Sequence, residues 1–299
     1  MMRSGFVALF GRPNAGKSTL LNRVVGTKLA IVSDKPQTTR HRILGVKNYP
    51  DGQIVFVDTP GVHRPLHRMN VRMVDAALGS ARDADVVVML VDASQNTGSG
   101  DRYLLDAVRS VTVPAVLALN KIDRIAKPRL LPLIEWYRAE HDFAEVVPIS
   151  ALTGDGVDVL VQAVLRLLPE GEALYPEDYL TDQPLRLLAA ELVREQVLRH
   201  THAELPFTTT VLVDRFEGEE DEGGLLHIYC SIVVERPSQK GIVIGHAGQM
   251  IKQIGTAARH ELEALMGRHV YLDLHVKVRE DWRENERLLD DAGLPGRRT

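Results

Sequence analysis

The sequence predicts a doubly wound, mostly parallel α/β domain followed by a smaller α+β domain. Up to about residue 168, short apolar runs alternate with amphipathic segments, the pattern of a parallel sheet whose two faces are covered by helices. After residue 184 the order becomes helix, two strands, two helices and a last strand. We therefore predict domains at 1–170 and 184–299, joined by an acidic, proline-containing linker at 171–183 that acts as a hinge.

Composition agrees with two ordinary globular domains. The chain has 299 residues, of which 44% are hydrophobic and 25% are charged. Its one cysteine, Cys230, cannot form an internal disulfide, which indicates a reducing compartment. No apolar run is long enough to cross a bilayer, so a cytoplasmic location is expected.

Charge gives no general sign of nucleic-acid binding. The net charge is −4, and residues 181–299 alone hold 15 basic and 20 acidic side chains. A nucleic-acid-binding domain usually has a basic surface. Residues 240–279 reverse the balance locally, with six basic and three acidic side chains. Any RNA site must therefore be a local patch.

The elements of the first domain follow from its apolar runs. Residues 155–168 have helical spacing of apolar positions and end at a proline, which stops a helix. The runs read as strands lie at 6–10, 53–58, 85–92, 114–120 and 145–149.

The segment Gly11–Ser18 matches the phosphate-binding pattern G-x-x-x-x-G-K-[ST] in full, between a predicted strand and a predicted helix. Glycines allow consecutive backbone N–H groups to turn toward a phosphate at the positive end of the helix. Lys17 supplies positive charge to the β and γ phosphates, and Ser18 offers a hydroxyl to Mg²⁺. The residues predicted to contact the phosphates are Asn14, Ala15, Gly16, Lys17, Ser18 and Thr19.

Three further motifs at the ends of successive strands select guanine. Asp58 begins a DTPG segment that can hold Mg²⁺ and bring the Gly61 N–H to a γ-phosphate. Asp123, in an NKID segment, can accept hydrogen bonds from guanine N1–H and N2–H₂, which adenine lacks. A backbone N–H after Ser150 can bind guanine O6. The residues predicted at these motifs are Asp58, Gly61, Asn120, Lys121, Asp123, Ser150, Ala151 and Leu152.

With the motifs GRPNAGKS, PQTTRHR, DTPGV, NKID and SAL, the first domain resembles the Era branch of the translation-factor class of GTPases. The resemblance implies GTP hydrolysis to GDP and phosphate, with a switch-one threonine that closes on Mg²⁺ and the γ-phosphate. Thr38 and Thr39 are the candidates, and Thr39 is preferred. The implied metal ligands are Ser18, Thr39 and Asp58, and the implied catalytic residues are Lys17, Thr39, Gly61 and Asn14.

Val62 occupies the position where many GTPases place a water-orienting glutamine. Related GTPases with a hydrophobic residue there recruit K⁺, held partly by the P-loop asparagine, so the resemblance implies that Asn14 binds K⁺. A loop asparagine that only tolerates an unusual backbone geometry is the alternative. His41 and His63 are expected to face solvent rather than act as bases, and residues 62–69 are expected to form a mobile switch.

In the second domain, residues 185–201 are predicted to be a helix, and 207–216 and 225–235 to be strands joined by an acidic turn at 217–222. Helices are expected around 241–244 and 249–266, and the last strand at 270–278 alternates apolar residues toward one face. Trp282 is expected to dock on the domain, with a frayed helix or tail from Arg283 onward.

The G-x-x-G segment Gly245–Gly248 lies between an apolar run and a helix, and in this order of elements it resembles a type II KH domain. KH glycine loops clamp a nucleic-acid backbone beside a hydrophobic groove. Met250 and Ile251 are expected to shape the groove together with Ile242 and Ile244, and Arg259 to face phosphates together with Lys240 and Lys252. His246, mostly neutral at pH 7, stands where a basic residue is common. The predicted RNA-binding residues are Lys240, Ile242, Ile244, Gly245, His246, Ala247, Gly248 and Lys252.

The resemblance to Era over nearly the whole chain implies a monomer that binds the 3′ end of small-subunit ribosomal RNA, assists 30S subunit maturation and associates peripherally with the inner face of the membrane. The cofactors implied are GTP or GDP, Mg²⁺ and K⁺. Two alternatives stay open: a membrane-associated or cell-cycle signalling GTPase that uses the KH domain for docking, and a GTPase that acts in RNA modification.

Overall fold

The computed structural model describes residues 2–296 apart from 36, 63, 64, 66, 202–204, 219–223 and 295. These residues form two compact units. Two short segments from the N-terminal half of the sequence group with the C-terminal unit. The first unit comprises Met1–Ala30, Thr39–Leu66 and Met73–Asp182, and the second comprises Ile31–Thr38, His67–Arg72 and Gln183–Thr299.

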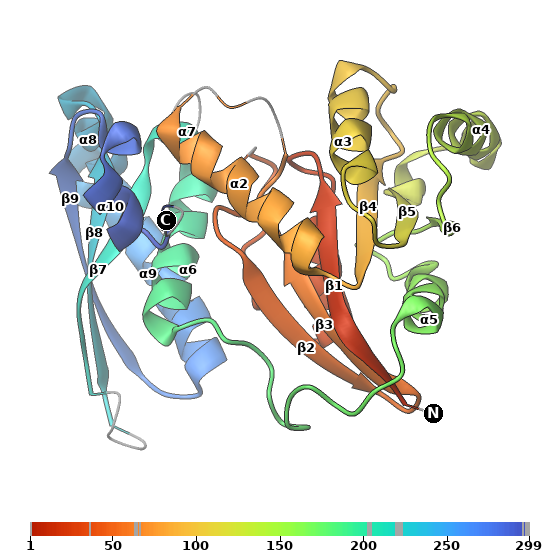
Figure 1. Ribbon diagram of the computed structural model, residues 1–299. Coiled ribbons are helices and arrows are strands. Elements are labelled where there is room, and N and C mark those ends of the chain that lie inside the picture. Colours follow the sequence, from red (N-terminus) through yellow and green to blue (C-terminus); the bar gives the residue numbers. More distant parts are fainter. Residues whose placement is uncertain are drawn as a thin grey trace. The chain divides into compact units, whose positions relative to one another are not determined.

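The first unit is built on a six-stranded sheet in the order β2-β3-β1-β4-β5-β6, in which every pair is parallel except β2 with β3 (Figure 1). The predicted α/β fold class is confirmed. Its strands are β1 (Arg3–Gly11), β2 (Ile43–Tyr49), β3 (Gly52–Asp58), β4 (Val86–Asp92), β5 (Ala115–Asn120) and β6 (Glu145–Pro148). Its helices are α1 (Lys17–Val25), α2 (Arg68–Asp83, whose first turn belongs to the second unit), α3 (Ser99–Arg109), α4 (Leu130–Glu140) and α5 (Val157–Leu167), with short 3₁₀ turns η1 (Ile122–Arg124) and η2 (Lys127–Arg129).

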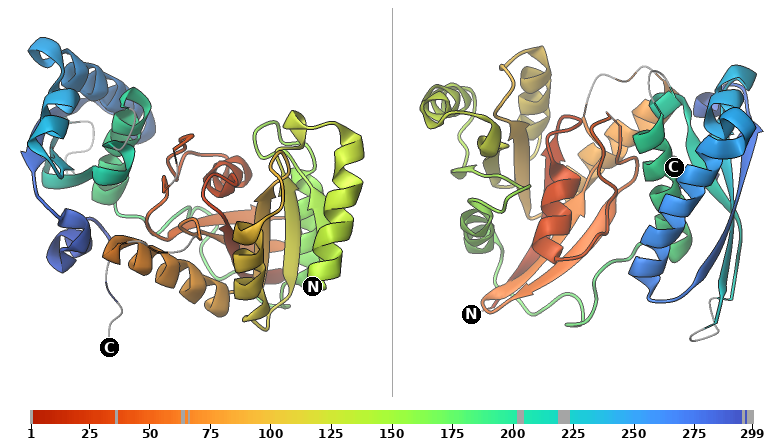
Figure 2. Two further views of the ribbon diagram at one scale, coloured as in Figure 1. Left: turned by 90° about the horizontal axis from the view of Figure 1, so that it is seen from above. Right: turned by 180° about the vertical axis from the view of Figure 1, so that it is seen from behind.

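Helices cover both faces of this sheet (Figure 2). On one face, apolar residues of α1 and α5, such as Leu20 and Leu160, pack with the sheet into one core. On the other, residues of α2, α3 and α4, such as Ala77 and Leu104, form a second core. The strands between the two cores are buried on both sides, which explains their continuous apolar runs.

Strand β2 is absent from the strands predicted from the sequence, and the predicted linker explains why it is stable. The linker follows the first unit closely: the Val46 N–H donates to the Leu180 carbonyl at 2.9 Å. The stacked rings of Tyr175 and Tyr179, 4.7 Å apart, pack on the apolar side chains of β2 and β3. The fully buried Gln53 side chain donates to the Tyr175 carbonyl at 2.8 Å. Residues 174–180 therefore cover the edge of the sheet.

The second unit contains a three-stranded sheet in the order β7-β8-β9, with β7–β8 antiparallel and β8–β9 parallel. Its core joins apolar residues of the sheet to those of α6, α8 and α9. The predicted order of elements is confirmed, although β7 begins three residues later than expected because a short helix precedes it. The elements are α6 (Leu185–His200), α7 (Leu205–Thr208), β7 (Thr210–Glu217), β8 (Leu226–Val234), α8 (Pro237–Ile244), η3 (His246–Gly248), α9 (Gln249–Met266) and β9 (Val270–Val278).

Beyond Trp282 the C-terminal segment forms a short turn and a helix with buried apolar side chains as far as Leu294, so of the predicted frayed helix or tail the helix is present and the fraying is wrong over that length. Trp282 is fully buried and donates from Nε1 to the Thr208 carbonyl at 2.8 Å. Arg283 forms a two-bond pair with Glu235 at 2.6 and 2.8 Å. The turn η4 (Trp282–Glu284) and helix α10 (Glu286–Asp291) follow, with Leu289 buried.

Some expected features fall on residues that the structure does not describe. These are residues 63, 64 and 66 of the expected switch and 219–222 of the acidic turn. Over the described residues, the helices are too short or too polar for any of them to span a membrane.

Candidate functional site: nucleotide pocket and glycine loop

The phosphate-binding loop connects β1 to α1 and holds Lys17 inside it. Asn14 and Gly16 have positive φ values of 63° and 99°, which bend the backbone around the lysine. The Lys17 side chain is buried, and its Nζ donates to the carbonyls of Gly11 and Arg12 at 3.2 and 3.0 Å. The ammonium group therefore already lies at the centre of the loop, where it can transfer its hydrogen bonds to phosphate oxygens.

Three oxygen-bearing side chains meet beside this loop. Ser18 Oγ lies 2.6 Å from Asp58 Oδ2 and 2.6 Å from Thr39 Oγ1, and Thr39 Oγ1 lies 3.4 Å from Asp58 Oδ2. Thr38 instead donates to the Lys35 carbonyl at 2.6 Å. The structure thus brings together the three predicted metal ligands and places Thr39, rather than Thr38, among them.

The donor set suits Mg²⁺. Magnesium prefers hard oxygen ligands and is usually held by one or two carboxylates or hydroxyls together with phosphates. Asp58 is fully buried, and its Oδ1 has no hydrogen-bond partner among the described residues. A buried carboxylate oxygen without a partner is unfavourable, so a cation at this position would satisfy it.

Burial changes the protonation of the two charged groups at this site. It lowers the pKa of Lys17 to about 8, and the nearby negative charge of Asp58 partly opposes the change. It also raises the pKa of Asp58 to about 6, opposed by the charge of Lys17 and by hydrogen bonds from Ser18, Thr39 and Thr59. Both shifts mean that the pocket without a ligand solvates its own charges poorly.

The segment after Asp58 lies directly against the phosphate loop. The Val62 N–H donates to the Gly11 carbonyl at 3.0 Å. A Cβ atom on Gly61 would lie 2.6 Å from the Pro13 nitrogen, so only glycine fits this close approach. His41 was expected to face solvent, and that expectation is wrong: the side chain is buried, in a segment packed into the protein.

Asn120 connects the motifs at the other end of the pocket. Its Nδ2 donates to the Ala15 carbonyl at 2.7 Å, and its Oδ1 accepts from the Ala151 N–H at 2.9 Å. Asp123 Oδ1 accepts from Ser150 Oγ at 2.6 Å. The asparagine therefore ties the phosphate loop to residues 150–152, and Asp123 is held in a fixed orientation.

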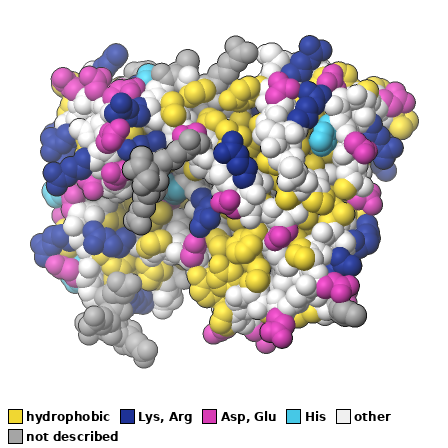
Figure 3. Space-filling view, viewed as in Figure 1, with side chains coloured by type: hydrophobic (Ala, Val, Ile, Leu, Met, Phe, Trp, Pro, Cys, Tyr) yellow, Lys and Arg dark blue, Asp and Glu magenta, His cyan; other side chains and the backbone are white. Residues whose placement is uncertain are grey.

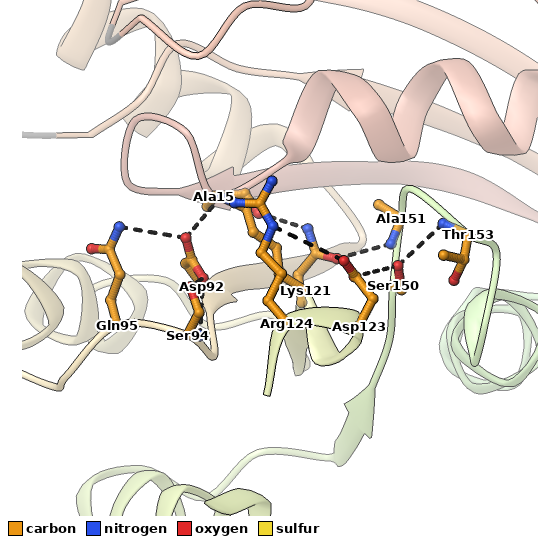
Figure 4. Close-up of polar contacts among 11 residues, drawn as sticks. Ala15, Asp92, Ser94, Gln95, Lys121, Asp123, Arg124, Ser150, Ala151 and Thr153 are labelled. Carbon is orange, nitrogen blue, oxygen red and sulfur yellow. Dashed lines mark hydrogen bonds and ion pairs between the residues drawn. The ribbon is translucent and has the colours of Figure 1, made fainter. Parts of the chain in front are cut away.

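Two side chains that the sequence reasoning missed support these motifs. Asp92, at the end of β4, accepts from Lys121 Nζ at 2.7 Å (Figure 4), and although burial opposes it, hydrogen bonds from Lys121 and Ser94 keep the pKa of Asp92 below its usual value. Arg23, on α1, donates to the carbonyls of Ala151 and Leu152. A carboxylate at the end of a strand was the available signal for Asp92. Nothing local marks Arg23, because its partners are about 130 residues away.

In the second unit, the predicted glycine loop connects α8 to α9. Gly245 and Gly248 have positive φ values of 73° and 77°, and Ala247 between them has 48°. A Cβ atom on Gly245 would lie 2.6 Å from Met250 Cβ. Ile242 is 51% exposed. The loop is therefore tightly turned, with an apolar side chain open to solvent beside it.

An open groove of about 540 Å³ lies along one face of α9. Of the predicted RNA-binding residues, Lys252 lines it, whereas Ile244 packs partly against the core, as do the flanking Met250 and Ile251. On the face shown in Figure 3, Lys and Arg side chains are interspersed with Asp and Glu. The residues that line the groove are His200, Gln249, Lys252, Gln253, Thr256, Ala257 and His260.

Comparison with known proteins decides the family. Residues 6–121 match the family described as 50S ribosome-binding GTPase, and residues 208–283 match the KH domain family. GTPase Era of Geobacter metallireducens is 51% identical to this chain over 97% of both sequences, and GTPase Era of Geotalea daltonii is 49% identical over the same shares. The chain belongs to the GTPase Era family.

Solved Era structures share the fold of the whole chain. A variant of Aquifex aeolicus Era bound to GDP·AlF₄⁻ is 42% identical with a TM-score of 0.94, over 99% of this chain and all of that one. Era in complex with MgGDPNP and nucleotides 1506–1542 of 16S ribosomal RNA is 43% identical with a TM-score of 0.95, over the same shares. As a member of the Era family, the chain is a GTPase that binds guanine nucleotides and Mg²⁺, with an RNA-binding KH domain.

Proposed function

We propose that this Era-family GTPase binds the 3′ end region of small-subunit ribosomal RNA in a GTP-dependent way and assists maturation of the 30S subunit. One observation carries the proposal: the nucleotide pocket and the KH glycine loop occur in one chain, and the Era structure that holds MgGDPNP together with a 16S RNA fragment is 43% identical over 99% of it. The likeness supports RNA over membrane docking as the role of the KH domain.

In this proposal the glycine loop holds the RNA backbone. The conformation at Gly245 and Gly248 lets a phosphodiester approach the main chain without side-chain interference. Lys240 and Lys252 are exposed and bear the positive charge for phosphates. The exposed side chain of Ile242 offers an apolar surface to a base.

Each residue of the nucleotide pocket has a proposed task that its position supports. Lys17 neutralises phosphate charge at the centre of the loop, and Gly61 donates its N–H to the γ-phosphate. Asp123 accepts the two guanine N–H groups while Asn120 keeps the surrounding loops in register. Mg²⁺, when bound to Ser18, Thr39 and Asp58, would offset charge on the β and γ phosphates.

We expect hydrolysis to be slow and faster in K⁺ than in Na⁺. The main chain of Val62 is fixed to the phosphate loop and its side chain is buried and apolar, so this position cannot orient a water molecule. Asn14, a residue of the phosphate loop whose side chain carries an amide oxygen, is the proposed ligand of K⁺. Phosphate release should be compared in KCl and NaCl at equal ionic strength, for the wild type and Asn14→Ala. Equal wild-type rates in the two salts would rule out this role.

The RNA proposal is tested by binding a short RNA that copies the 3′ end of 16S ribosomal RNA. We expect tight binding with a non-hydrolysable GTP analogue and weaker binding with GDP or without nucleotide. In the double variant His246→Asp/Ala247→Asp, two added negative charges at the loop should lower the affinity by at least about tenfold through repulsion of the phosphates.

A matched control is Lys127→Asp, which changes the net charge by the same amount at an exposed position of the first unit. It should leave RNA binding nearly unchanged. RNA binding that ignores both the nucleotide and the loop variant would leave the GTPase standing and remove the proposed RNA function.

We further propose that the protein works as a monomer in the cytoplasm, where ribosomal subunits assemble. Peripheral association with the inner face of the membrane remains an additional expectation from the family resemblance. Light scattering of the purified protein and its distribution between supernatant and anionic lipid vesicles would test these two statements.

A further inference from the structure

Helix α6 of the second unit carries three charged side chains that are almost completely buried. Glu191, Arg194 and Glu195 are 5%, 1% and 0% exposed. Charged side chains are rarely buried to this degree unless they are paired, because removing a charge from water costs free energy. A buried ion pair is weak evidence for stability, since an apolar pair of similar volume often serves the fold as well. Stability alone therefore does not explain these charges, and their contacts indicate another role.

Arg194 and Glu195 both bond main-chain groups of the segment 31–38, which belongs to the same unit, and Glu195 also accepts from Arg199 Nη2 of the same helix at 2.9 Å. Arg194 forms a two-bond pair with Glu191 at 2.7 and 2.6 Å, and the same guanidinium donates from Nη2 to the Thr38 carbonyl. Glu195 accepts from the Val32 N–H at 3.1 Å. Helix α6 therefore holds the segment near both of its ends by its main chain.

The boundary between the two units falls at the peptide bond between Thr38 and Thr39. The carbonyl of Thr38 is held by Arg194. The hydroxyl of the next residue, Thr39, lies 2.6 Å from Ser18 and 3.4 Å from Asp58 in the nucleotide pocket. The carbonyl that Arg194 holds therefore belongs to the rigid peptide group between Thr38 and Thr39, and Thr39 is the threonine proposed to bind the metal.

We propose that Arg194 is a positioning residue for the switch: by fixing the Thr38 carbonyl it orients Thr39 for the triphosphate state, and it passes the nucleotide state to the RNA-binding unit. Switch segments of GTPases are ordered by the γ-phosphate and Mg²⁺ and released on hydrolysis. A guanidinium that holds the Thr38 carbonyl favours the ordered state of the switch, and by linkage the ordered state favours the contact between Arg194 and Thr38. The second half of this inference rests on the RNA function proposed above, whereas the first half does not.

The test removes the buried pair without leaving a charge behind. The double variant Glu191→Leu/Arg194→Met keeps the volume nearly constant, and thermal unfolding checks that both units remain folded. We expect the affinity for a non-hydrolysable GTP analogue with Mg²⁺ to fall about tenfold while the affinity for GDP stays the same, because Thr39 engages only the triphosphate state. A purely structural role would lower both affinities together.

A second variant and a control complete the experiment. Arg194→Lys keeps a positive charge beside Glu191 but loses the planar set of guanidinium donors. We expect its affinity for the GTP analogue to lie between that of the wild type and that of the double variant. Arg186→Met removes an exposed arginine of the same helix that contacts Val213 rather than the switch, and it should behave as the wild type. An unchanged ratio of GTP-analogue to GDP affinity in both Arg194 variants would overturn the proposal.

RNA binding separates the two proposals. If the wild type binds RNA more tightly with the GTP analogue than with GDP, the double variant should lose most of that difference, and retention of the full difference would contradict the transmission by Arg194. If the wild type shows no such difference, the proposed RNA function fails, and the ratio of nucleotide affinities alone still decides whether Arg194 positions Thr39.

Discussion

In the proposed site, guanine recognition depends on one carboxylate, Asp123, whose orientation is fixed by the hydroxyl of Ser150. A carboxylate that accepts from N1–H and N2–H₂ discriminates strongly, because any base without these donors leaves it unpaired. The role of Asp123 was predictable from the NKID motif. The bridge made by Asn120 was not, because its partners, Ala15 and Ala151, are distant in the sequence.

Replacement of Asp123 by asparagine should exchange the preferred base. We expect the affinity for GTP to fall by about two orders of magnitude. Affinity for xanthosine triphosphate should rise, since an amide N–H can donate to the O2 atom that xanthine carries in place of the amino group. Competition with a fluorescent nucleotide measures both effects. Asp142→Asn, at an exposed acid of the same unit, is the control, and GTP affinity within about twofold of the wild type would contradict this role of Asp123.

The lowered pKa of Lys17 predicts that nucleotide binding takes up a proton at alkaline pH. With a pKa of about 8 in the free protein, about three quarters of the lysine is neutral at pH 8.5. Phosphate groups raise the pKa again, so binding should draw in a proton, and affinity should fall as the pH rises through 8. Asp58, with a pKa of about 6, is already ionised there and does not interfere.

Calorimetry of GDP binding in two buffers of different ionisation enthalpy detects this proton. The observed heats should differ at pH 8.5, and the uptake assigned to Lys17 should shrink toward pH 7, where the amine is already charged. Identical heats in both buffers at pH 8.5 would show that the lysine is protonated before the ligand arrives.

At the scale of elements, the sequence predicted the helices and strands with strong local patterns. It missed those whose apolar side chains are buried by residues distant in the sequence. The parallel strands and α9 have long apolar or periodic runs, and all of them are present. Strand β2 was missed because its apolar residues are buried by Tyr175 and Tyr179, in a segment read as an exposed linker. The C-terminal elements η4 and α10 were predicted only as a frayed helix or tail, because the surrounding residues are polar and their buried side chains are few: Trp282, Leu289, Ala292 and Leu294.

The buried Trp282 should be one of the largest single contributors to the stability of the second unit. Trp282→Ala is expected to lower the free energy of unfolding by about 3–5 kcal/mol, because it leaves a cavity and removes the bond to the Thr208 carbonyl. Chemical denaturation followed by circular dichroism measures the loss. Trp136→Ala, at a partly buried tryptophan of the first unit, is the control and should cost less. A loss below about 1 kcal/mol for Trp282→Ala would show that the segment is not anchored there.

At the scale of the whole molecule, the grouping of residues 31–38 and 67–72 with the second unit was not predictable. The charged residues of α6 look like a solvated helix face in the sequence, yet Glu191, Arg194 and Glu195 are buried, and Arg194 and Glu195 bond main-chain groups of the segment 31–38. Residues 67–72 are bound by acids of the C-terminal segment, with Arg72 2.6 Å from Asp290. Such contacts depend on which segments fold together, and local patterns carry no information about that.

The most direct test of a nucleotide-controlled RNA-binding protein is the reciprocal measurement. The affinity for a non-hydrolysable GTP analogue should be measured with and without a saturating amount of the 16S RNA fragment. Linkage requires that RNA raise this affinity by the same factor by which the analogue raises the affinity for RNA. We predict a rise of at least about fivefold, the lower end of typical coupling, with GDP affinity unchanged or lowered. An analogue affinity that is the same with and without RNA would contradict the coupling of the two units.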